Sequence, residues 1–75
     1  MPDDLSSVMA HNLLRMGRVA PASCALGERQ GDALVRRGYA YFVGFGSADG
    51  GRLHYRLTPA GLSRARGIGE ANEYA

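Results

Sequence analysis

The chain contains no lysine, a single cysteine and no apolar run of 18 residues. Without such a run, no segment is expected to span a membrane. The lone cysteine, Cys24, excludes an intramolecular disulfide and is typical of a protein from a reducing compartment. The N-terminal residues Met1–Asp4 are acidic and lack the apolar stretch of a signal peptide. These absences together predict a cytoplasmic protein.

Side chains that carry out catalysis or hold metals are also sparse. Cys24, His11 and His54 are scattered along the chain, with no pair at the short spacing of metal ligands. The carboxylates have no organised histidine near them. The glycine-rich segment 46–51 lacks the lysine and the hydroxyl residue of a phosphate-binding loop. We therefore expect no enzyme activity, no metal and no cofactor.

The length of 75 residues sets the scale of the fold. A chain of this size forms one domain that buries a modest fraction of its surface, so its margin of stability is small. Neither a disulfide nor a metal is expected to add to that margin, which favours self-association, such as a homodimer, or a stable complex. We expect residues 1–67 to form the domain and residues 68–75 to form a flexible tail.

The charges are unevenly distributed. All nine basic residues are arginines, and between residues 5 and 69 they face only Glu28, Asp32 and Asp49, a net charge of +6. The remaining acidic residues lie at the two ends. A basic body of this kind is attracted to phosphate backbones or to acidic protein surfaces. A GC-rich genome, which favours arginine over lysine, is an alternative explanation for the missing lysine but not for the separation of charge.

The hydrophobic pattern changes its period along the chain. Apolar residues at helical spacing predict helices at 5–16, ending at Gly17, and at 28–37, where Gly31 is a weak point. Residues 21–27 could form one short helical turn. Thr58 and Pro59 begin a last helix over 59–66, as an N-cap hydroxyl and a first-turn proline.

Between the last two of these helices, the pattern predicts a β-hairpin with strands at 39–45 and 52–57. Alternation assigns Leu53, Tyr55 and Leu57 to a core-facing side of the second strand. The opposite, solvated side receives Arg52, His54 and Arg56. On the first strand, Phe42 is expected opposite Tyr39, Tyr41 and Val43. An aromatic residue left exposed here would favour a partner surface.

Two segments resemble parts of winged-helix regulators. The run Ala33–Tyr39 is similar to the exit from a recognition helix into the wing, and Tyr55–Gly61 is similar to the run that closes the wing and opens a helix. Together, over about residues 28–66, they resemble bacterial MarR-type and PadR-type proteins. The resemblance implies a small α+β, winged helix-turn-helix-like domain, pared down because only residues 21–27 are available for the usual second helix.

The resemblance also implies which residues would contact a partner. In the family, the helix matching 28–37 enters the DNA major groove, which places Glu28, Arg29 and Gln30 near base edges and Arg36 and Arg37 near the backbone. The wing would contribute Arg52, His54 and Arg56. The same arginines could instead be a solvated helix face, in which Asp32 pairs with Arg29 or Arg36, and the wet side of a hairpin.

These observations leave several functions open. The first is a small DNA-binding protein, either a transcriptional regulator or an accessory factor of a phage or mobile element. The second is a protein-binding module on the same fold, such as a phage-encoded, anti-CRISPR-like inhibitor of a host nucleic-acid-binding complex. The missing second helix, Gly31 and the acidic ends favour the second function. The third is an oligomerising structural piece.

Overall fold

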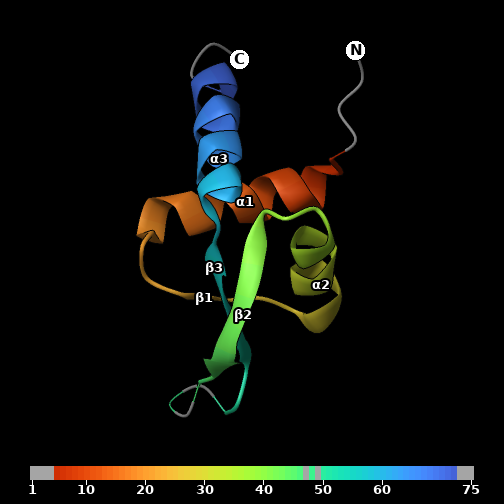
Figure 1. The fold of residues 1–75 in the computed structure, drawn as a ribbon, viewed down its shortest axis with the longest axis vertical. Coiled ribbons are helices and arrows are strands. Elements are labelled where there is room, and N and C mark those ends of the chain that lie inside the picture. Colours follow the sequence, from red (N-terminus) through yellow and green to blue (C-terminus); the bar gives the residue numbers. More distant parts are fainter. Residues whose placement is uncertain (1–4, 47, 49, 73–75) are drawn as a thin grey trace.

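The computed structural model describes residues 5–46, 48 and 50–72, and within this part the chain forms a small α+β domain. Its elements follow the order α1 (Ser7–Val19), β1 (Cys24–Ala25), α2 (Glu28–Arg36), β2 (Ala40–Phe45), β3 (Leu53–Leu57) and α3 (Pro59–Asn72) (Figure 1). The three strands form an antiparallel sheet in the order β1-β3-β2. The predicted α+β class is confirmed, and the predicted two-stranded hairpin gains a third strand.

Helix α1 begins at Ser6, whose hydroxyl accepts a hydrogen bond from the Met9 N–H at 3.2 Å. The predicted end of this helix at Gly17 is wrong, since the helix continues to Val19. A Cβ at Gly17 would lie 3.2 Å from the Cβ of Ala65, so this glycine allows α1 and α3 to approach each other closely. The helix ends before the cis Ala20–Pro21 peptide, where proline disfavours a helical conformation of the preceding residue.

Residues 21–27 do not form the predicted helical turn. Cys24 and Ala25 instead pair with Tyr55 and His54 of β3. The Leu26 N–H extends the pairing by donating to the Leu53 carbonyl at 3.1 Å. A contact between segments about 30 residues apart decides the conformation here, because a two-residue strand has no period of its own.

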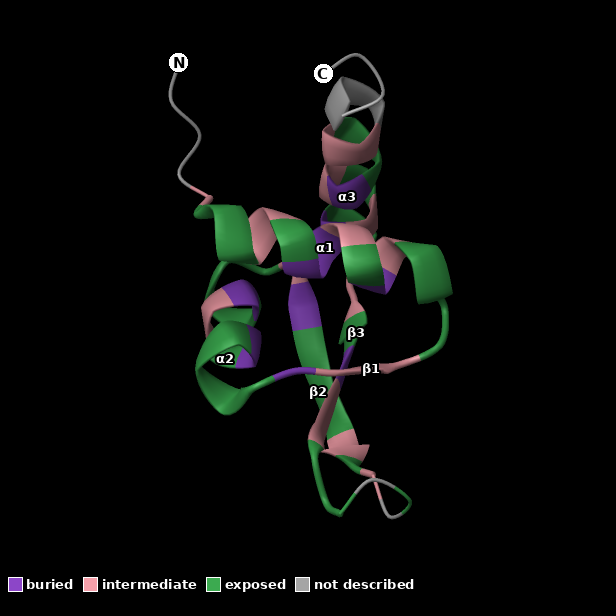
Figure 2. Cartoon of the chain, turned by 180° about the vertical axis from the view of Figure 1, so that it is seen from behind, coloured by how far each residue is buried: buried purple, intermediate pink, exposed green. Residues whose placement is uncertain are grey.

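The core lies between α1, α2 and one face of the sheet. Seven apolar residues, from every element except β1 and from Leu26 just after it, are buried in it: Leu13, Met16, Leu26, Leu34, Ala40, Tyr55 and Ala65. Figure 2 shows the buried residues gathered where α1 crosses the sheet and where α2 faces it. Gly31 of α2 is buried against the Tyr55 ring, and a Cβ at Gly31 would overlap that ring. Gly31, which lowers the helical propensity of α2, therefore leaves the space that the Tyr55 ring occupies.

The start of α3 confirms the predicted N-cap at Thr58. Its hydroxyl accepts from the Gly61 N–H at 3.0 Å and donates to the Gly38 carbonyl at 2.6 Å, which joins the helix to the loop before β2. The helix continues to Asn72 and not to the predicted 66. Its packing against α1, where Gly69 comes close to Leu14, stabilises a glycine-rich stretch that has little helical propensity. Residues 73–75 of the predicted tail lie outside the described residues.

The hairpin has the predicted two faces, with one irregularity. Tyr55 is buried, Arg56 is exposed, and Tyr41 pairs with Arg56 on the outer face. The register shifts by one residue between Phe42 and Gly44. This bulge places Phe45 on the same face as Phe42, and their ring centroids are 5.4 Å apart. Residues 47 and 49 of the predicted glycine-rich connection lie outside the described residues.

No helix in the described part of the chain combines the length and the apolar character that a membrane crossing requires.

Candidate functional site

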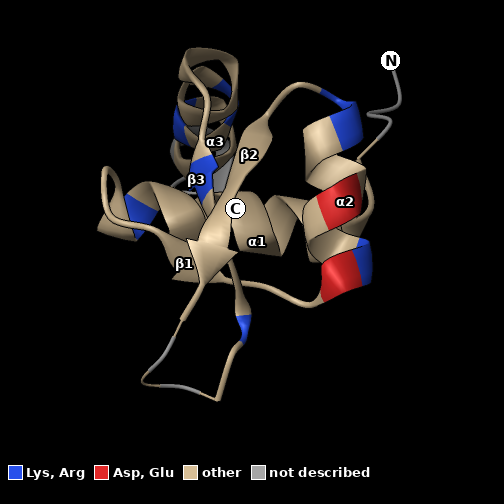
Figure 3. Cartoon of the chain, turned by 60° about the horizontal axis from the view of Figure 1, so that its bottom comes forward, with Lys and Arg blue, Asp and Glu red and all other residues tan. Residues whose placement is uncertain are grey.

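The predicted binding residues of α2 lie on its solvent side, mixed with carboxylates. Arg29 and Gln30 are exposed in the first turn, next to Glu28. Arg36 is held by Asp32 through an Nε–Oδ2 contact of 3.0 Å, one turn apart. Figure 3 shows acidic and basic positions alternating along this helix. The predicted pairing of Asp32 with Arg36 is thus observed, and it offsets part of the positive charge that α2 would present to a phosphate backbone.

Arg37, the residue that caps the C-terminal end of α2, is also exposed. The helix and its cap therefore carry three arginines against two carboxylates, Glu28 and Asp32. This surface has little net charge, although it is the one that the winged-helix resemblance singles out.

The predicted residues of the hairpin do not form one surface. Arg52 is exposed just before β3 and lines a small hollow of about 220 Å³ that Gln30 of α2 also lines. His54 is half-buried, and its Nδ1 lies 3.2 Å from the Ser23 hydroxyl on the other side of the β1–β3 pair. Arg56 lines a different and larger groove. Arg52 and Gln30 therefore line the same hollow, whereas Arg56 lines another groove.

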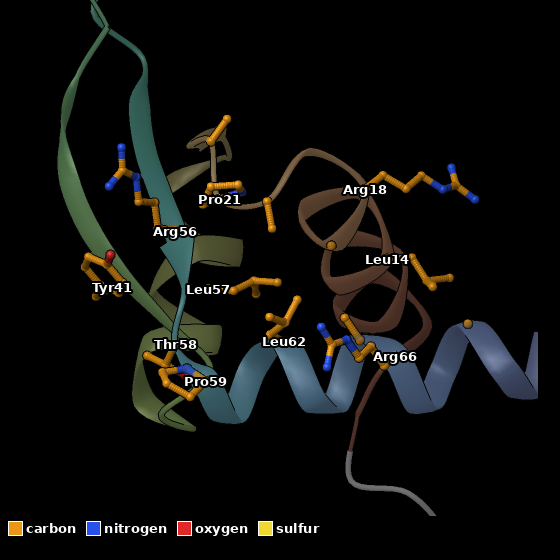
Figure 4. A pocket seen from close by; sticks show the side chains of 15 residues that line it. Leu14, Arg18, Pro21, Tyr41, Arg56, Leu57, Thr58, Pro59, Leu62 and Arg66 are labelled. Carbon is orange, nitrogen blue, oxygen red and sulfur yellow. The ribbon is translucent and has the colours of Figure 1, made fainter.

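That larger groove lies between the hairpin, the end of α1 with the loop that follows it, and the first turns of α3. Its volume is about 900 Å³. Leu57 and Leu62, both half-buried, point towards each other at its floor (Figure 4). Around them lie the side chains of three exposed arginines, one from each of three elements: Arg18 of α1, Arg56 of β3 and Arg66 of α3. We call this feature the arginine groove.

The arginine groove differs from α2 in its charge balance. None of the 15 lining residues whose side chains the structure describes is acidic. Three arginines therefore line one concave surface, and each guanidinium presents a planar array of N–H donors suited to phosphate or carboxylate oxygens. The sequence predicted only Arg56 among them. Arg18 and Arg66 were missed because residues this far apart in the chain come together only through the packing of α1 on α3.

Arg15, one turn before Arg18 on α1, has a different role. Its Nη2 donates to the Ala25 carbonyl at 2.7 Å and approaches the Cys24 sulfur at 3.2 Å. These two contacts hold the short strand β1 against helix α1. Arg15 contributes to the fold, and we do not count it among the groups that the arginine groove presents to a ligand.

Among the described titratable groups, Tyr55 in the core has a shifted pKa. Burial, with smaller contributions from the carboxylates of Glu28 and Asp32, raises the pKa of the Tyr55 hydroxyl above its ordinary value of 10.0. Among the described residues, no three histidine, cysteine or acidic side chains lie close enough to hold a metal ion. The arrangement of the arginine groove favours binding of an anionic partner.

Comparison with known proteins finds no matching family, no similar curated protein and no similar solved structure.

Proposed function

We propose that this domain is a non-enzymatic DNA-binding protein, a transcriptional regulator or an accessory factor of a phage or mobile element. In this proposal the arginine groove contacts the phosphate backbone. The observation that carries it is that Arg18, Arg56 and Arg66 line one groove, whose described lining residues include no carboxylate. Phosphate contacts supply most of the affinity of non-specific DNA binding, and they need arginines that no neighbouring acid offsets.

The order of the elements gives further support. Helix α2 leads directly into the β2–β3 hairpin, and β1 adds to the other edge of β3. A helix followed by a hairpin is the arrangement expected of a wing module, which is why we propose a pared-down winged-helix-like protein. A single helix, α2, lies between β1 and β2, and its exposed side is nearly balanced in charge. We therefore place the main phosphate contacts in the arginine groove and not on α2.

The expected salt dependence follows from the number of arginines. Three phosphate contacts correspond to a slope of about −2.7 in the plot of log K against log salt concentration. The affinity should then fall about 40-fold between about 50 and about 200 mM salt. Fluorescence anisotropy with a labelled random duplex measures this directly, at several salt concentrations.

A matched pair of variants separates the arginine groove from α2. The first replaces the three groove arginines (Arg18→Gln, Arg56→Gln, Arg66→Gln), and the second replaces three arginines of α2 and its cap (Arg29→Gln, Arg36→Gln, Arg37→Gln). Both remove the same charge. We expect the first variant to lose binding and its salt slope, and the second to keep most of both. Circular dichroism checks that each variant is folded.

Other results would change the assignment. A larger loss from the α2 variant would indicate that α2 enters the major groove, as in the family that the sequence resembles. Equal losses would mean that net charge alone drives binding. If the wild-type protein bound no DNA even at about 50 mM salt, the DNA-binding proposal would be rejected.

The apolar floor of the arginine groove favours a second candidate function, protein binding. A duplex backbone needs no apolar contact, whereas an amphipathic helix with an acidic flank would fill a surface that has leucines below and arginines around it. An inhibitor of a host nucleic-acid-binding complex would use the groove in this way. We expect affinity capture with the wild-type chain to recover a stoichiometric protein partner even after nuclease treatment. The groove variant should fail to capture this partner.

A further inference from the structure

We infer that strand β2 is a docking edge for a second copy of this chain, through antiparallel pairing of the two β2 strands. The inference concerns the β2 edge, of which Tyr41 also lines the arginine groove. The variants that test it change neither Tyr41 nor the groove arginines, so its outcome is distinguishable from that of the proposed DNA binding. It rests on three features of β2: its free backbone edge, its exposed apolar side chains and its lack of charge.

The first feature is the backbone of β2. In the sheet order β1-β3-β2, this strand is an edge strand. The Thr58 N–H donates to the Tyr39 carbonyl at 3.0 Å. Along an antiparallel ladder, hydrogen-bonded residue pairs alternate with non-hydrogen-bonded pairs. The next hydrogen-bonded pair is therefore Tyr41 with Arg56. The peptide groups of Ala40 and Phe42 therefore point away from β3. Ala40 is only 3% exposed, so the Phe42 peptide group supplies the donor and the acceptor that another strand can reach.

The second feature is the set of side chains that β2 leaves exposed. Phe45 is 70% exposed, Phe42 is 47% exposed and Tyr41 is 45% exposed, together with Val43 at 41%. Figure 2 shows the middle of β2 as exposed, while its first residue is buried under the helices. The bulge between Phe42 and Gly44 brings Phe42 and Phe45 to the same face. At about 200 Å² per aromatic side chain, the three rings expose roughly 320 Å².

The third feature, the absence of charge, indicates which partner fits. Strand β2 has the sequence Ala-Tyr-Phe-Val-Gly-Phe, without lysine, proline or any acidic residue. Natural edge strands usually carry such residues to prevent pairing with other chains. An acidic or basic partner would find no complementary charge on this edge. The β2 strand of a second copy meets no like charge on this edge, although the body of the domain is basic. Pairing of the two β2 strands gives a self-complementary two-fold contact.

The area of the contact sets its expected strength. Two copies carry roughly 650 Å² of exposed aromatic surface along this edge, but Tyr41 lies on the opposite face of the sheet from Phe42 and Phe45, so pairing covers only part of it. A stable interface usually buries about 1,200–2,000 Å². The bulge also confines regular pairing to the residues before it. We therefore expect a weak, concentration-dependent dimer and not an obligate one.

Sedimentation equilibrium over a wide range of protein concentration tests the inference, with the wild-type chain and two variants. Val43→Lys places a charge on the docking edge, at the bulge residue that has no partner in the register. Val8→Lys makes the same change on α1, where the valine is 52% exposed and far from the edge in sequence and fold. The mass of the wild type and of Val8→Lys should rise from 8.0 kDa towards twice that value. Val43→Lys should weaken the dimer by at least about tenfold.

A second variant and a second measurement guard against a misfolded Val43→Lys protein. Phe45→Lys changes the most exposed aromatic residue of β2 and should have the same effect. In the wild type, the outward amide of Phe42 should exchange with solvent more slowly as the protein concentration rises. The inference is overturned if the wild type stays monomeric to millimolar concentration, or if the β2 variants dimerise as well as Val8→Lys does.

Discussion

Replacing Gly31 by alanine should destabilise this domain, although alanine is the better helix former. Gly31 lies in the fourth position of α2 and is buried against Tyr55. An added Cβ would overlap Cζ and Cε1 of that ring. The ring has little room to move, because Tyr55 is only 5% exposed and meets Phe42 edge to face, with centroids 5.7 Å apart.

Two opposing effects give the magnitude. Exchanging glycine for alanine inside a helix gains about 1 kcal/mol. Overfilling a packed core costs about 1–3 kcal/mol, and the overlap at Gly31 belongs at the upper end of that range. The net loss in the free energy of unfolding is then about 2 kcal/mol. For a domain of this size, such a loss lowers Tm by roughly 8–16 °C.

Urea and thermal unfolding, followed by circular dichroism, measure this change against a matched control. Gly67→Ala in α3 makes the same substitution where a new Cβ would have no neighbour within 4 Å. It should stabilise the protein by up to about 1 kcal/mol. In a Tyr55→Leu background, which removes the ring, Gly31→Ala should lose most of its cost. If Gly31→Ala stabilised the wild type as Gly67→Ala does, the packing argument would be refuted.

Three further predictions concern single contacts. Thr58→Ala should cost about 1–2 kcal/mol in urea unfolding, since it removes the N-cap and the bond to the Gly38 carbonyl, while Thr58→Ser should retain most of that stability. Stability should decline as the pH rises above 10.0, because the unfolded chain releases the Tyr55 proton before the folded one does. Tyr55→Phe should flatten this decline, and equal slopes in thermal melts would contradict the cause given. Asp32→Asn breaks an exposed ion pair with Arg36 and should change stability by less than about 0.5 kcal/mol; a larger change would show that the pair is more than a surface contact.

Local chemistry made much of the fold predictable from the sequence. The switch from helical to alternating hydrophobicity near Gly38 placed α2 and both strands of the hairpin to within one residue at each end. The pair Thr58–Pro59 marked the start of α3, because an N-cap hydroxyl and a first-turn proline act within a few residues. Alternation correctly placed Tyr55 inward and Arg56 outward on β3, whereas His54, predicted on the solvated side, is half-buried against Ser23.

Other features depended on contacts between distant segments. Strand β1 has two residues and forms because β3 lies beside it, so no local sequence pattern predicts it. Gly17 and the glycines of α3 weaken helices in isolation, yet both helices continue through them because α1 packs on α3. Gly31 looked like a defect in α2, and only Tyr55 shows why it is needed there.

The candidate site divides in the same way. Composition by itself determined that the body of the chain is basic, and hairpin alternation predicted that Arg56 faces outward. The sequence predicted binding residues on both α2 and the hairpin, and on α2 Asp32 pairs with Arg36. Only the tertiary structure gathered Arg18, Arg56 and Arg66 around one groove. The physical reason is that electrostatic attraction to a partner depends on how charges are placed in space, and this placement comes from helix packing rather than from spacing along the chain.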